Sequence, residues 1–324
     1  MKAVIVNEDQ SLSWDEVDQP KIGDQEVLIK VSATAINRAD LMQRKGFYPP
    51  PPGASEVMGL ECAGEIVEVG AGCSRYKVGD KVCALLAGGG YGQYAAAHEG
   101  SVLPIPDGLS DEQAAALPEV FATAWLNLFI EAGLKAGDKA IIHAGASGVG
   151  TTAIQLCKAF GASSFVTVGS EDKLRACIEL GASSGFNRHD GSFLETARTF
   201  AGDSGVDVIL DPVGAGYLSD NLTLLGLGGR LVLIGLMGGI KAELDLAQMM
   251  MKRARIIGST LRTRPVTEKA VVMAQLEEKV WPKIANQDIK PIIEVVFPIT
   301  KVAEAHDLIA SDTTTGKVIL TVGH

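Results

Sequence analysis

Two patterns of hydrophobic and polar residues divide the chain. Residues 1–118 hold short alternating or apolar runs that are separated by Gly, Pro and Gly-Asp turns, which is typical of strands. These runs are Ala3–Val6, Glu26–Val31, Gly64–Val69, Lys81–Leu85 and Gly92–Ala97. The pattern therefore predicts a β-rich region. After it, Ser110 and Gln113 have the spacing of a capping box and predict the start of a helix.

From residue 138 the pattern changes to strands that alternate with helices. The predicted strands are Lys139–His143, Phe165–Val168, Gly185–Asn187, Val206–Leu210, Arg230–Ile234 and Arg255–Ile257. Helical segments between them end at glycines. This alternation predicts an α/β fold with a parallel sheet covered by helices on both faces. Six strands match a complete doubly wound nucleotide-binding domain.

The last part of the chain returns to a mixed pattern. A helical segment near Glu268–Ile284 is followed by Ile292–Phe297, Thr300–Ile309 and Lys317–Val322, which we interpret as strand, helix and strand. The sequence contains no clear repeat and no low-complexity linker.

The segment Lys139–Gly161 carries the most specific signal. An apolar run leads into Gly145-Ala146-Ser147-Gly148-Val149-Gly150, and a helical pattern follows. Strand, glycine-rich turn and helix is the context in which a dinucleotide-binding fingerprint is meaningful. Small residues let the backbone approach a pyrophosphate, and the helix N-terminus offers free N–H groups to the anion. Ser147 stands where the second glycine of the usual motif belongs; its hydroxyl fits there and can donate to a phosphate or to the nicotinamide.

The choice between NAD and NADP is predicted from the end of the second strand of this region. An acidic residue about 20 positions after the last fingerprint glycine selects NAD in this fold. Gly169 and Ser170 stand there instead, so nothing at that position repels the 2′-phosphate of NADPH. Arg188, after the third strand, suits a phosphate clamp, although a surface-loop charge also fits the sequence. The neighbouring Glu171 and Asp172 weaken the electrostatic argument, and we expect NADPH rather than NADH.

Composition removes several classes of function. The formal net charge of −10 over 324 residues argues against a nucleic-acid partner held by phosphate contacts. No apolar run has the length of a membrane span, and the first residues do not have the pattern of a signal peptide. The five cysteines are widely spaced without a C-x-x-C pair. We therefore expect reduced, mostly buried thiols in a cytoplasmic protein.

Motifs along the whole chain carry a family resemblance. They are Asn37-Arg38-Ala39-Asp40, Gly46-Phe47-Tyr48-Pro49, Gly59-Leu60-Glu61, Gly88-Gly89-Gly90-Tyr91, His143 to Gly150, Gly169 to Lys173, Gly235 to Gly239 and Gly316-Lys317. Together they resemble the zinc-free quinone oxidoreductase branch of the medium-chain dehydrogenase/reductase superfamily. The most similar subgroup is the tumour-suppressor-inducible type of NADPH:quinone oxidoreductase.

The resemblance implies a specific domain organisation. A GroES-like substrate domain is formed by residues 1–118 together with residues 265–324, and a Rossmann NADPH-binding domain, residues 119–264, is inserted between them. It also implies a homodimer formed through the Rossmann domains, with an edge strand near Arg255–Leu261 at the contact.

The resemblance also bears on zinc. Metal-dependent relatives hold a catalytic zinc with Cys, His and a third Cys or acidic residue, and Asn37, Leu60 and Glu119 align with these positions. Asn is a poor zinc ligand and Leu is none, so we expect no metal. His98 and His143 are the remaining candidates, and we interpret them as a surface or strand residue and a packed strand end. Without zinc, the favoured substrates are those that already accept hydride well.

The resemblance further implies a set of cofactor contacts. Lys173 is similar to the family's 2′-phosphate lysine, although a solvated lysine fits the sequence too. By this resemblance, Asn37 and Thr123 would contact the nicotinamide end, Gly235–Gly239 and Leu261–Arg264 would form walls, and Gly316-Lys317 would close the site. The predicted cofactor-binding residues are Asn37, Thr123, Gly145, Ser147, Gly148, Val149, Gly150, Gly169, Ser170, Lys173, Arg188, Gly235, Leu236, Met237, Leu261, Arg264 and Lys317.

The predicted catalytic residues are Tyr48 and Asp40. Tyr48 is the best candidate to orient or protonate a carbonyl oxygen, with Asp40 and water behind it, although an aromatic beside Pro49–Pro52 is more often a packing residue. The leading function is quinone reduction by NADPH, and a quinone's reduced anion can take its proton from water. The alternatives are reduction of the C=C bond of an enone or alkenal, which needs a better-placed acid, and a non-catalytic NADPH-binding or structural protein.

Overall fold

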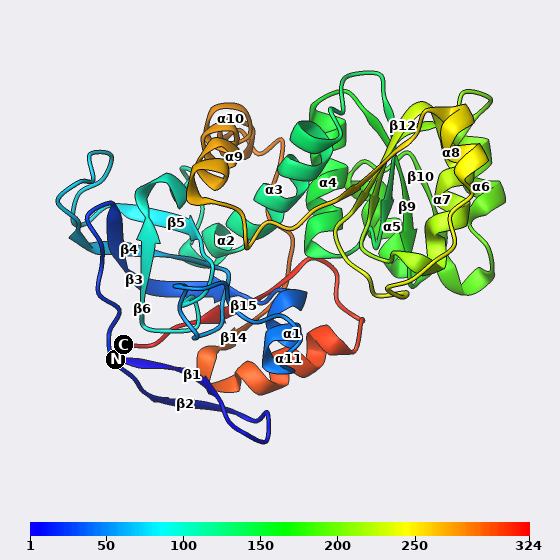
Figure 1. Ribbon diagram of the computed structural model, residues 1–324. Coiled ribbons are helices and arrows are strands. Elements are labelled where there is room, and N and C mark those ends of the chain that lie inside the picture. The colour runs from blue at the N-terminus through cyan, green and yellow to red at the C-terminus, as the bar shows by residue number, and fades with distance from the viewer. The chain divides into compact units, whose positions relative to one another are not determined.

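A computed structural model describes all 324 residues, which form two compact units. The first unit contains Met1–Ala122 and Leu261–His324, and the second contains Thr123–Thr260. Both chain termini therefore belong to the first unit, and the second unit is an insertion (Figure 1). The boundaries predicted from sequence are 118/119 and 264/265.

The first unit is built on a seven-stranded sheet of order β14-β15-β3-β4-β5-β7, with β6 also paired to β3. All of these strand pairs are antiparallel except β14 with β15. Strands β1 and β2 form a separate antiparallel pair. The bounds are β1 (Lys2–Val6), β2 (Leu12–Glu16), β3 (Glu26–Ala35), β4 (Glu61–Val69), β5 (Lys81–Leu85), β6 (Tyr94–His98), β7 (Val102–Pro104), β14 (Ile293–Pro298) and β15 (Lys317–Thr321).

One pairing in this sheet positions the site. Strand β15, from the end of the chain, runs antiparallel to β3, and Ile319 is the partner of Ala35. Ile36, directly after β3, donates its backbone N–H to the carbonyl oxygen of Val318 at 2.9 Å. The first residue of β15, Lys317, is therefore placed beside the end of β3, far away in sequence.

Helices complete the first unit. They are α1 (Arg38–Arg44), α2 (Asp111–Ala115), α9 (Val266–Lys279), α10 (Trp281–Ala285) and α11 (Val302–Ala310), with the 3-10 turns η1 (Glu99–Ser101) and η5 (Ile299–Lys301). The predicted capping box is confirmed, because the Ser110 hydroxyl accepts from Gln113 N and Ser110 N donates to Gln113 Oε1. Helix α3 (Pro118–Trp125) spans the boundary between the units.

The second unit has a six-stranded parallel sheet of order β10-β9-β8-β11-β12-β13. Chain order reverses between β8 and β11, which is the doubly wound arrangement that the sequence predicts. Helices α4 and α5 pack together on one face of the sheet, while α6, α7 and α8 lie on the other (Figure 1). The strands are β8 (Lys139–His143), β9 (Ser163–Val168), β10 (Ser184–Asn187), β11 (Val206–Asp211), β12 (Leu225–Leu233) and β13 (Arg255–Gly258). The remaining elements are η2 (Leu126–Glu131), α4 (Gly148–Ala159), α5 (Glu171–Leu180), η3 (Arg188–Asp190), α6 (Leu194–Ala201), η4 (Ala215–Tyr217), α7 (Leu218–Leu224) and α8 (Leu246–Lys252).

Strand β12 begins at Leu225, earlier than the predicted start at Arg230. The added segment contains Gly226, Gly228 and Gly229, which hide the apolar alternation that marks a strand. A Cβ at Gly226 would lie 2.2 Å from the carbonyl oxygen of Ser204, so close backbone packing explains this glycine.

No helix of either unit combines the length and the apolar character that crossing a membrane requires.

Candidate active site

The glycine-rich turn lies at the carboxyl end of β8, where the strand order reverses. A Cβ at Gly145 would lie 2.7 Å from the Val166 side chain, and one at Gly150 would lie 2.5 Å from the carbonyl oxygens of Ala144 and Gly145. Both glycines are therefore required by close packing of turn, helix and sheet. The 12-residue helix α4 follows, so its unpaired N–H groups face the position expected for a pyrophosphate.

Ser147 caps this helix. Its hydroxyl oxygen accepts a hydrogen bond from Gly150 N at 3.0 Å, and its side chain is exposed. Because the hydroxyl acts as acceptor toward the helix, its own hydrogen can be donated to a ligand. Serine at this position thus combines a helix cap with a donor that glycine cannot supply.

Gly169, Ser170 and Arg188, which are predicted to lie near the 2′-phosphate, stand at the ends of β9 and β10. Ser170 caps α5, and its hydroxyl accepts from Lys173 N at 3.3 Å. Arg188 directly follows β10, and its Nη2 lies 3.5 Å from the point where a Cβ on Gly169 would stand. The guanidinium therefore lies over Gly169, and a larger residue there would crowd it.

Lys173 differs from these neighbours because its side chain is only 9% exposed. Burial raises the pKa of Cys177 to about 12, and the positive charge of Lys173 acts against that rise. The Lys173 side chain is thus buried rather than extended into solvent. All five cysteines of the chain are free thiols.

A buried polar network ties the carboxyl ends of three strands together, and sequence analysis did not identify it. His143 Nδ1 lies 2.9 Å from Thr167 Oγ1, and His143 Nε2 lies 2.7 Å from Asn221 Oδ1. Asn221 in turn donates to Asp211 Oδ2 at 2.9 Å. Burial lowers the pKa of His143, which favours the neutral ring. Because Asn221 Oδ1 can only accept, His143 Nε2 is the donor in this contact. The network stabilises the carboxyl end of the sheet, where the fingerprint turn follows β8.

The loop after β12 lies beside the end of β11. Met237 N donates to the carbonyl oxygen of Pro212 at 3.1 Å, and Gly238 N donates to Val213 O at 2.7 Å. A Cβ at Gly235 would lie 2.8 Å from that same Pro212 oxygen. The side chains of Leu236 and Met237 are each 50% exposed. This loop is therefore fixed by its backbone and presents apolar side chains outward.

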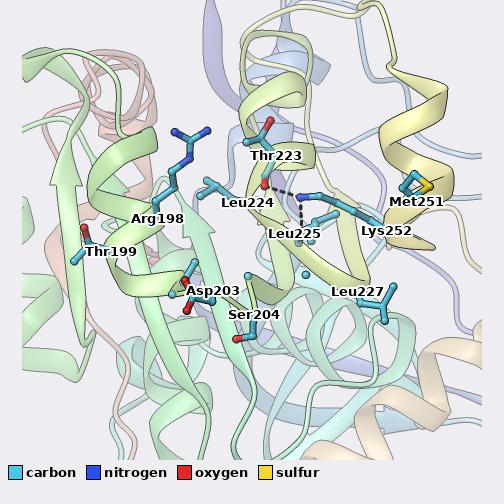
Figure 2. Close-up of a pocket in the computed structure, with 14 residues that line it drawn as sticks. Arg198, Thr199, Asp203, Ser204, Thr223, Leu224, Leu225, Leu227, Met251 and Lys252 are labelled. Atoms are coloured by element: carbon cyan, nitrogen blue, oxygen red, sulfur yellow. Dashed lines mark hydrogen bonds between the residues drawn. The ribbon is translucent and has the colours of Figure 1, made fainter.

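A hollow of about 760 Å³ lies at the other end of the sheet. Figure 2 shows its wall, in which Lys252 Nζ donates to the carbonyl oxygens of Thr223 and Leu225. Its residues precede β11 or β13, or lie before and at the start of β12, so they lie at the amino ends of parallel strands. The fingerprint turn follows the carboxyl end of β8, and the hollow is thus separate from the predicted cofactor site.

The first unit contributes a buried ionic cluster of Asn37, Glu61 and Lys317. The ammonium group of Lys317 donates to Ile36 O at 2.9 Å and to Asn37 Oδ1 at 2.7 Å, and lies 2.8 Å from Glu61 Oε1. Asn37 Nδ2 donates to the same Glu61 oxygen at 2.8 Å. Lys317 is 4% exposed and Glu61 is fully buried. All three ammonium hydrogens have an acceptor, so Lys317 would act on a ligand through Asn37 unless one of these bonds opened.

Glu119 extends this cluster. Its backbone N–H, in the first turn of α3, donates to Glu61 Oε2 at 2.9 Å, and the residue as a whole is half-buried. Burial, followed by repulsion from Glu61, raises the pKa of Glu119 to about 8, against the attraction of Lys317 and Lys269. Glu119 is therefore mainly a neutral carboxylic acid at neutral pH.

Asp40 is predicted to lie behind Tyr48, but its hydrogen-bond partners in the structure are Asn37, Gly59 and Tyr91. Its carboxylate accepts from Asn37 N at 2.7 Å, from Gly59 N at 3.2 Å and from the Tyr91 hydroxyl at 3.2 Å. The Tyr91 hydroxyl also lies 3.2 Å from His306 Nε2. Burial raises the pKa of Asp40 to about 6 and lowers the pKa of His306 to about 4. Asp40 thus anchors the start of α1, including Asn37.

Tyr48 is half-buried and is held by an arginine that sequence analysis missed. Arg262 donates to Ala87 O at 2.8 Å, Tyr48 O at 3.1 Å and Gln43 Oε1 at 2.8 Å. Its guanidinium carbon also stands 5.4 Å from the centre of the Tyr48 ring. All three acceptors of Arg262 are neutral groups, and no sequence motif marks such a buried arginine. The sequence indicates only that Arg262 lies within Leu261–Arg264, the segment predicted to line the site.

The remaining predicted contacts are Thr123, Leu261 and Arg264. Thr123 O accepts from Asn127 Nδ2 at 2.7 Å within the second unit. Leu261 is 6% exposed, and Arg264 forms an ion pair with Glu268 at 3.1 Å. The predicted cofactor contacts therefore fall into two sets, one on each unit.

The side chains at the aligned zinc positions do not suit a metal ion. Leu60 has no donor atom, and Asn37 is hydrogen-bonded to an ammonium and a carboxylate. No group of three or more His, Cys, Asp or Glu side chains in the chain is arranged to hold a metal. The Lys317 ammonium at this place would repel a cation.

Comparison with known proteins decides the family. Residues 23–107 match the alcohol dehydrogenase GroES-like domain, and residues 148–277 match the zinc-binding dehydrogenase family. A quinone oxidoreductase of Rattus norvegicus is 35% identical over 300 residues, which cover 91% of this chain and 88% of the relative. The chain belongs to the quinone oxidoreductase branch of the medium-chain dehydrogenase/reductase superfamily.

Solved structures agree with this family. The Escherichia coli quinone oxidoreductase complexed with NADPH has a TM-score of 0.86 at 25% identity and covers 99% of this chain, with 98% of its own chain matched. An NAD-dependent alcohol dehydrogenase also has a TM-score of 0.86, at 29% identity with full coverage of both chains. The fold is thus shared by relatives that differ in cofactor and substrate, and the residues of the site must distinguish them.

Proposed function

We propose that this member of the quinone oxidoreductase branch is an NADPH-dependent quinone reductase of the tumour-suppressor-inducible type that works without a metal ion. The observation that carries the proposal is the Asn37–Glu61–Lys317 cluster, in which Asn37 occupies one position aligned with the metal ligands and Glu61 directly follows another, Leu60. A metal usually holds the alkoxide during alcohol oxidation. A site without one suits a substrate that accepts hydride readily, and a quinone does so because its reduced anion is delocalised.

The second unit suits NADPH. When bound, NADPH supplies a hydride from C4 of its nicotinamide. The N-terminus of α4 would hold the pyrophosphate, and the Ser147 hydroxyl would donate to a phosphate or to the nicotinamide amide. Ser170 and Arg188 would hold the 2′-phosphate, since no carboxylate stands at the position where an NAD-selecting residue is expected.

The first unit suits the nicotinamide end and the substrate. Asn37 is fixed on both sides of its amide by Glu61 and Lys317, so its orientation is set before a ligand arrives. Asp40 acts as a positioning residue for Asn37, and Tyr48, held by Arg262, would orient a substrate oxygen. Most of the rate would come from positioning the two reacting rings.

The direct test is rapid-mixing measurement of NADPH oxidation by 1,4-benzoquinone, with a simple enone as the second acceptor. We expect fast oxidation with the quinone. Tight NADPH binding without oxidation by either acceptor would contradict the reductase function and favour a non-catalytic NADPH-binding protein.

We also infer a homodimer formed through the second unit. Strand β13 is an edge of the parallel sheet, and the preceding helix α8 carries the exposed Leu246, Met250 and Met251. An unpaired edge next to apolar side chains is a typical site of association. Sedimentation equilibrium would show a dimer, and a charged residue in place of Met251 would weaken it.

A further inference from the structure

Arg262 ties together three segments of the first unit that lie apart in sequence. Its Nη2 donates to Gln43 on α1, its Nη1 to the carbonyl oxygen of Tyr48 after α1, and its Nε to the carbonyl oxygen of Ala87 after β5. Arg262 is only 3% exposed. A planar guanidinium directs its donors at fixed angles and can serve three segments at once, whereas a lysine ammonium cannot reproduce this geometry.

No ion pair neutralises the charge of Arg262. All three of its acceptors are neutral oxygens. The carboxyl groups of Asp40 and Glu119 are near enough to act on Arg262 electrostatically, but neither forms an ion pair with it. Buried charges in proteins are normally paired. An unpaired cation beside the predicted substrate side of the site therefore indicates that negative charge is bound or formed there.

Tyr48 is the group through which this charge can reach a ligand. The guanidinium carbon of Arg262 stands 5.4 Å from the centre of the Tyr48 ring, within the range of a cation–π interaction. Tyr76 and Tyr91 of the same unit donate their hydroxyl groups to a carbonyl and a carboxylate oxygen. The hydroxyl of the half-buried Tyr48 has no such partner within the chain. It is therefore available to a ligand.

The effect of Arg262 on the Tyr48 hydroxyl gives the sign of this electrostatic influence. Burial, followed by the charge of Glu119, raises the pKa of Tyr48 above its ordinary value of 10, and the positive charge of Arg262 acts against that rise. Tyr48 is thus a neutral donor at neutral pH, while Arg262 favours negative charge at the phenol oxygen. A negative substrate oxygen that accepts from this hydroxyl would be stabilised by the same charge.

We propose, on the basis of the proposed reductase function, that Arg262 is a positioning residue that fixes Tyr48 and, through it, stabilises the negative charge that hydride transfer places on the substrate oxygen. The quinone gains one hydrogen and two electrons as a hydride, which the nicotinamide loses, and the resulting anion takes a proton from water. The Tyr48 hydroxyl donates a hydrogen bond to this anion and keeps its own proton. Arg262 thereby supplies a fixed positive charge on the substrate side without a metal ion.

The test compares Arg262→Met and Arg262→Lys with the same two changes at Arg75. Arg75 is a matched control because its guanidinium carbon stands 5.3 Å from the centre of the Tyr76 ring, outside the predicted site. Single-turnover oxidation of NADPH is followed over a range of 1,4-benzoquinone concentrations. We expect Arg262→Met to lower the saturating rate about 100-fold, since a displacement of about 1 Å can have this effect. Arg262→Lys keeps the charge but not the fork, and should lose about 10-fold.

The concentration dependence separates this role from damage to the fold. The quinone concentration for half-maximal rate should change little in both Arg262 variants, because the lost interaction acts mainly on the anion formed in the reaction. The Arg75 variants should keep the wild-type rate. An unchanged saturating rate in the Arg262 variants would overturn the proposal. A rate loss matched by equal losses in NADPH affinity and in unfolding free energy would also overturn it.

A double-mutant cycle with Tyr48→Phe tests whether Arg262 acts through the hydroxyl. Tyr48→Phe removes the hydroxyl group and keeps the ring. In this background Arg262→Met should lower the rate by less than about threefold, because residues that act as a unit have non-additive effects. Equal losses from Arg262→Met in both backgrounds would contradict the proposal.

A further measurement does not depend on turnover. Phe47 is 73% exposed, and the bond that follows it leads into Tyr48, whose carbonyl group Arg262 holds. Chymotrypsin should cleave after Phe47 about 10-fold faster in Arg262→Met than in the wild type or Arg75→Met, because a released segment opens more often. Arg262→Lys gives the same comparison if Arg262→Met does not fold. Equal cleavage in all of these proteins would mean that Arg262 does not fix Tyr48.

The two kinds of measurement distinguish this proposal from the proposed function. If cleavage after Phe47 rises but the wild type oxidises NADPH with neither 1,4-benzoquinone nor 2-cyclohexen-1-one, the reductase function is wrong, and the role of Arg262 in the reaction with it. If the wild type reduces the quinone and the Arg262 variants do so at the same rate, the reductase function stands and only the role of Arg262 is overturned.

Discussion

The two candidate binding regions both involve electrostatic interactions, but they are built differently. They are the Gly145–Gly150 turn of the second unit and the Asn37–Glu61–Lys317 cluster of the first. The turn uses backbone N–H groups, and its glycines are demanded by contacts of 2.5–2.7 Å to their neighbours. The cluster uses side chains from segments up to 280 residues apart. A backbone site tolerates changes in charge and fails when a Cβ is added. A side-chain site should behave in the opposite way.

The largest expected effect breaks the cluster. Lys317→Met would leave Glu61 buried without its cation, and removal of one partner from a buried ion pair costs about 3–5 kcal/mol. Urea unfolding should show this loss in free energy. The double variant Lys317→Met/Glu61→Gln should recover a large part of it, since no charge is then left unpaired. A double variant as unstable as the single one would contradict the ion-pair explanation.

A smaller effect is expected in the turn. Gly145→Ala would place a methyl group 2.7 Å from the Val166 side chain, and such overpacking costs about 1–3 kcal/mol. NADPH affinity should fall as well, because the turn must shift to relieve the contact. Calorimetric titration with NADPH checks this, with Gly323→Ala as the control, where a Cβ meets nothing within 4 Å. Unchanged affinity in Gly145→Ala would argue against pyrophosphate binding at the turn.

The smallest effect sharpens the electrostatic side of the comparison. Folding raises the pKa of Glu119 from 4.5 to about 8, so the folded state keeps a proton that the unfolded state releases. Its contribution therefore makes stability fall as pH rises from about 4.5 to about 8. Asp40 acts in the same direction up to about pH 6, and His306 acts in the opposite direction below pH 6.5.

The interval from pH 6.5 to 8 thus isolates Glu119 among these three groups. Thermal unfolding across this interval should show a decline in the wild type that is smaller in Glu119→Gln. The control Glu112→Gln, in the first turn of α2, should decline like the wild type. Equal declines in all three proteins would mean that Glu119 is ionised in the folded state.

The difference in construction also explains what the sequence could predict. The turn, its strand and its helix are contiguous, so periodicity and glycine spacing identify them, and the parallel sheet was predicted with its strands. The start of β12 was missed because Gly226, Gly228 and Gly229 interrupt its pattern.

The contacts within the cluster could not be predicted in the same way. Asn37, Glu61 and Lys317 each belong to a motif of the family resemblance, but no local sequence pattern predicts that they contact one another. Only the pairing of β15 with β3 brings Lys317 to Asn37. Arg262 and the His143–Asn221–Asp211 network were missed for the same reason, since their partners are distant in sequence.

The central claim is that this protein is a reductase whose second unit selects NADPH over NADH. The most direct measurement is kcat/KM for NADPH and for NADH, with 1,4-benzoquinone, in the wild type, Arg188→Gln and the control Arg175→Gln. The account predicts that the wild type and the control prefer NADPH. Arg188→Gln should lose about 10- to 100-fold with NADPH alone, because a charge-assisted hydrogen bond contributes about 1.5–3 kcal/mol. Equal use of both cofactors by the wild type, or an unchanged preference in Arg188→Gln, would contradict it.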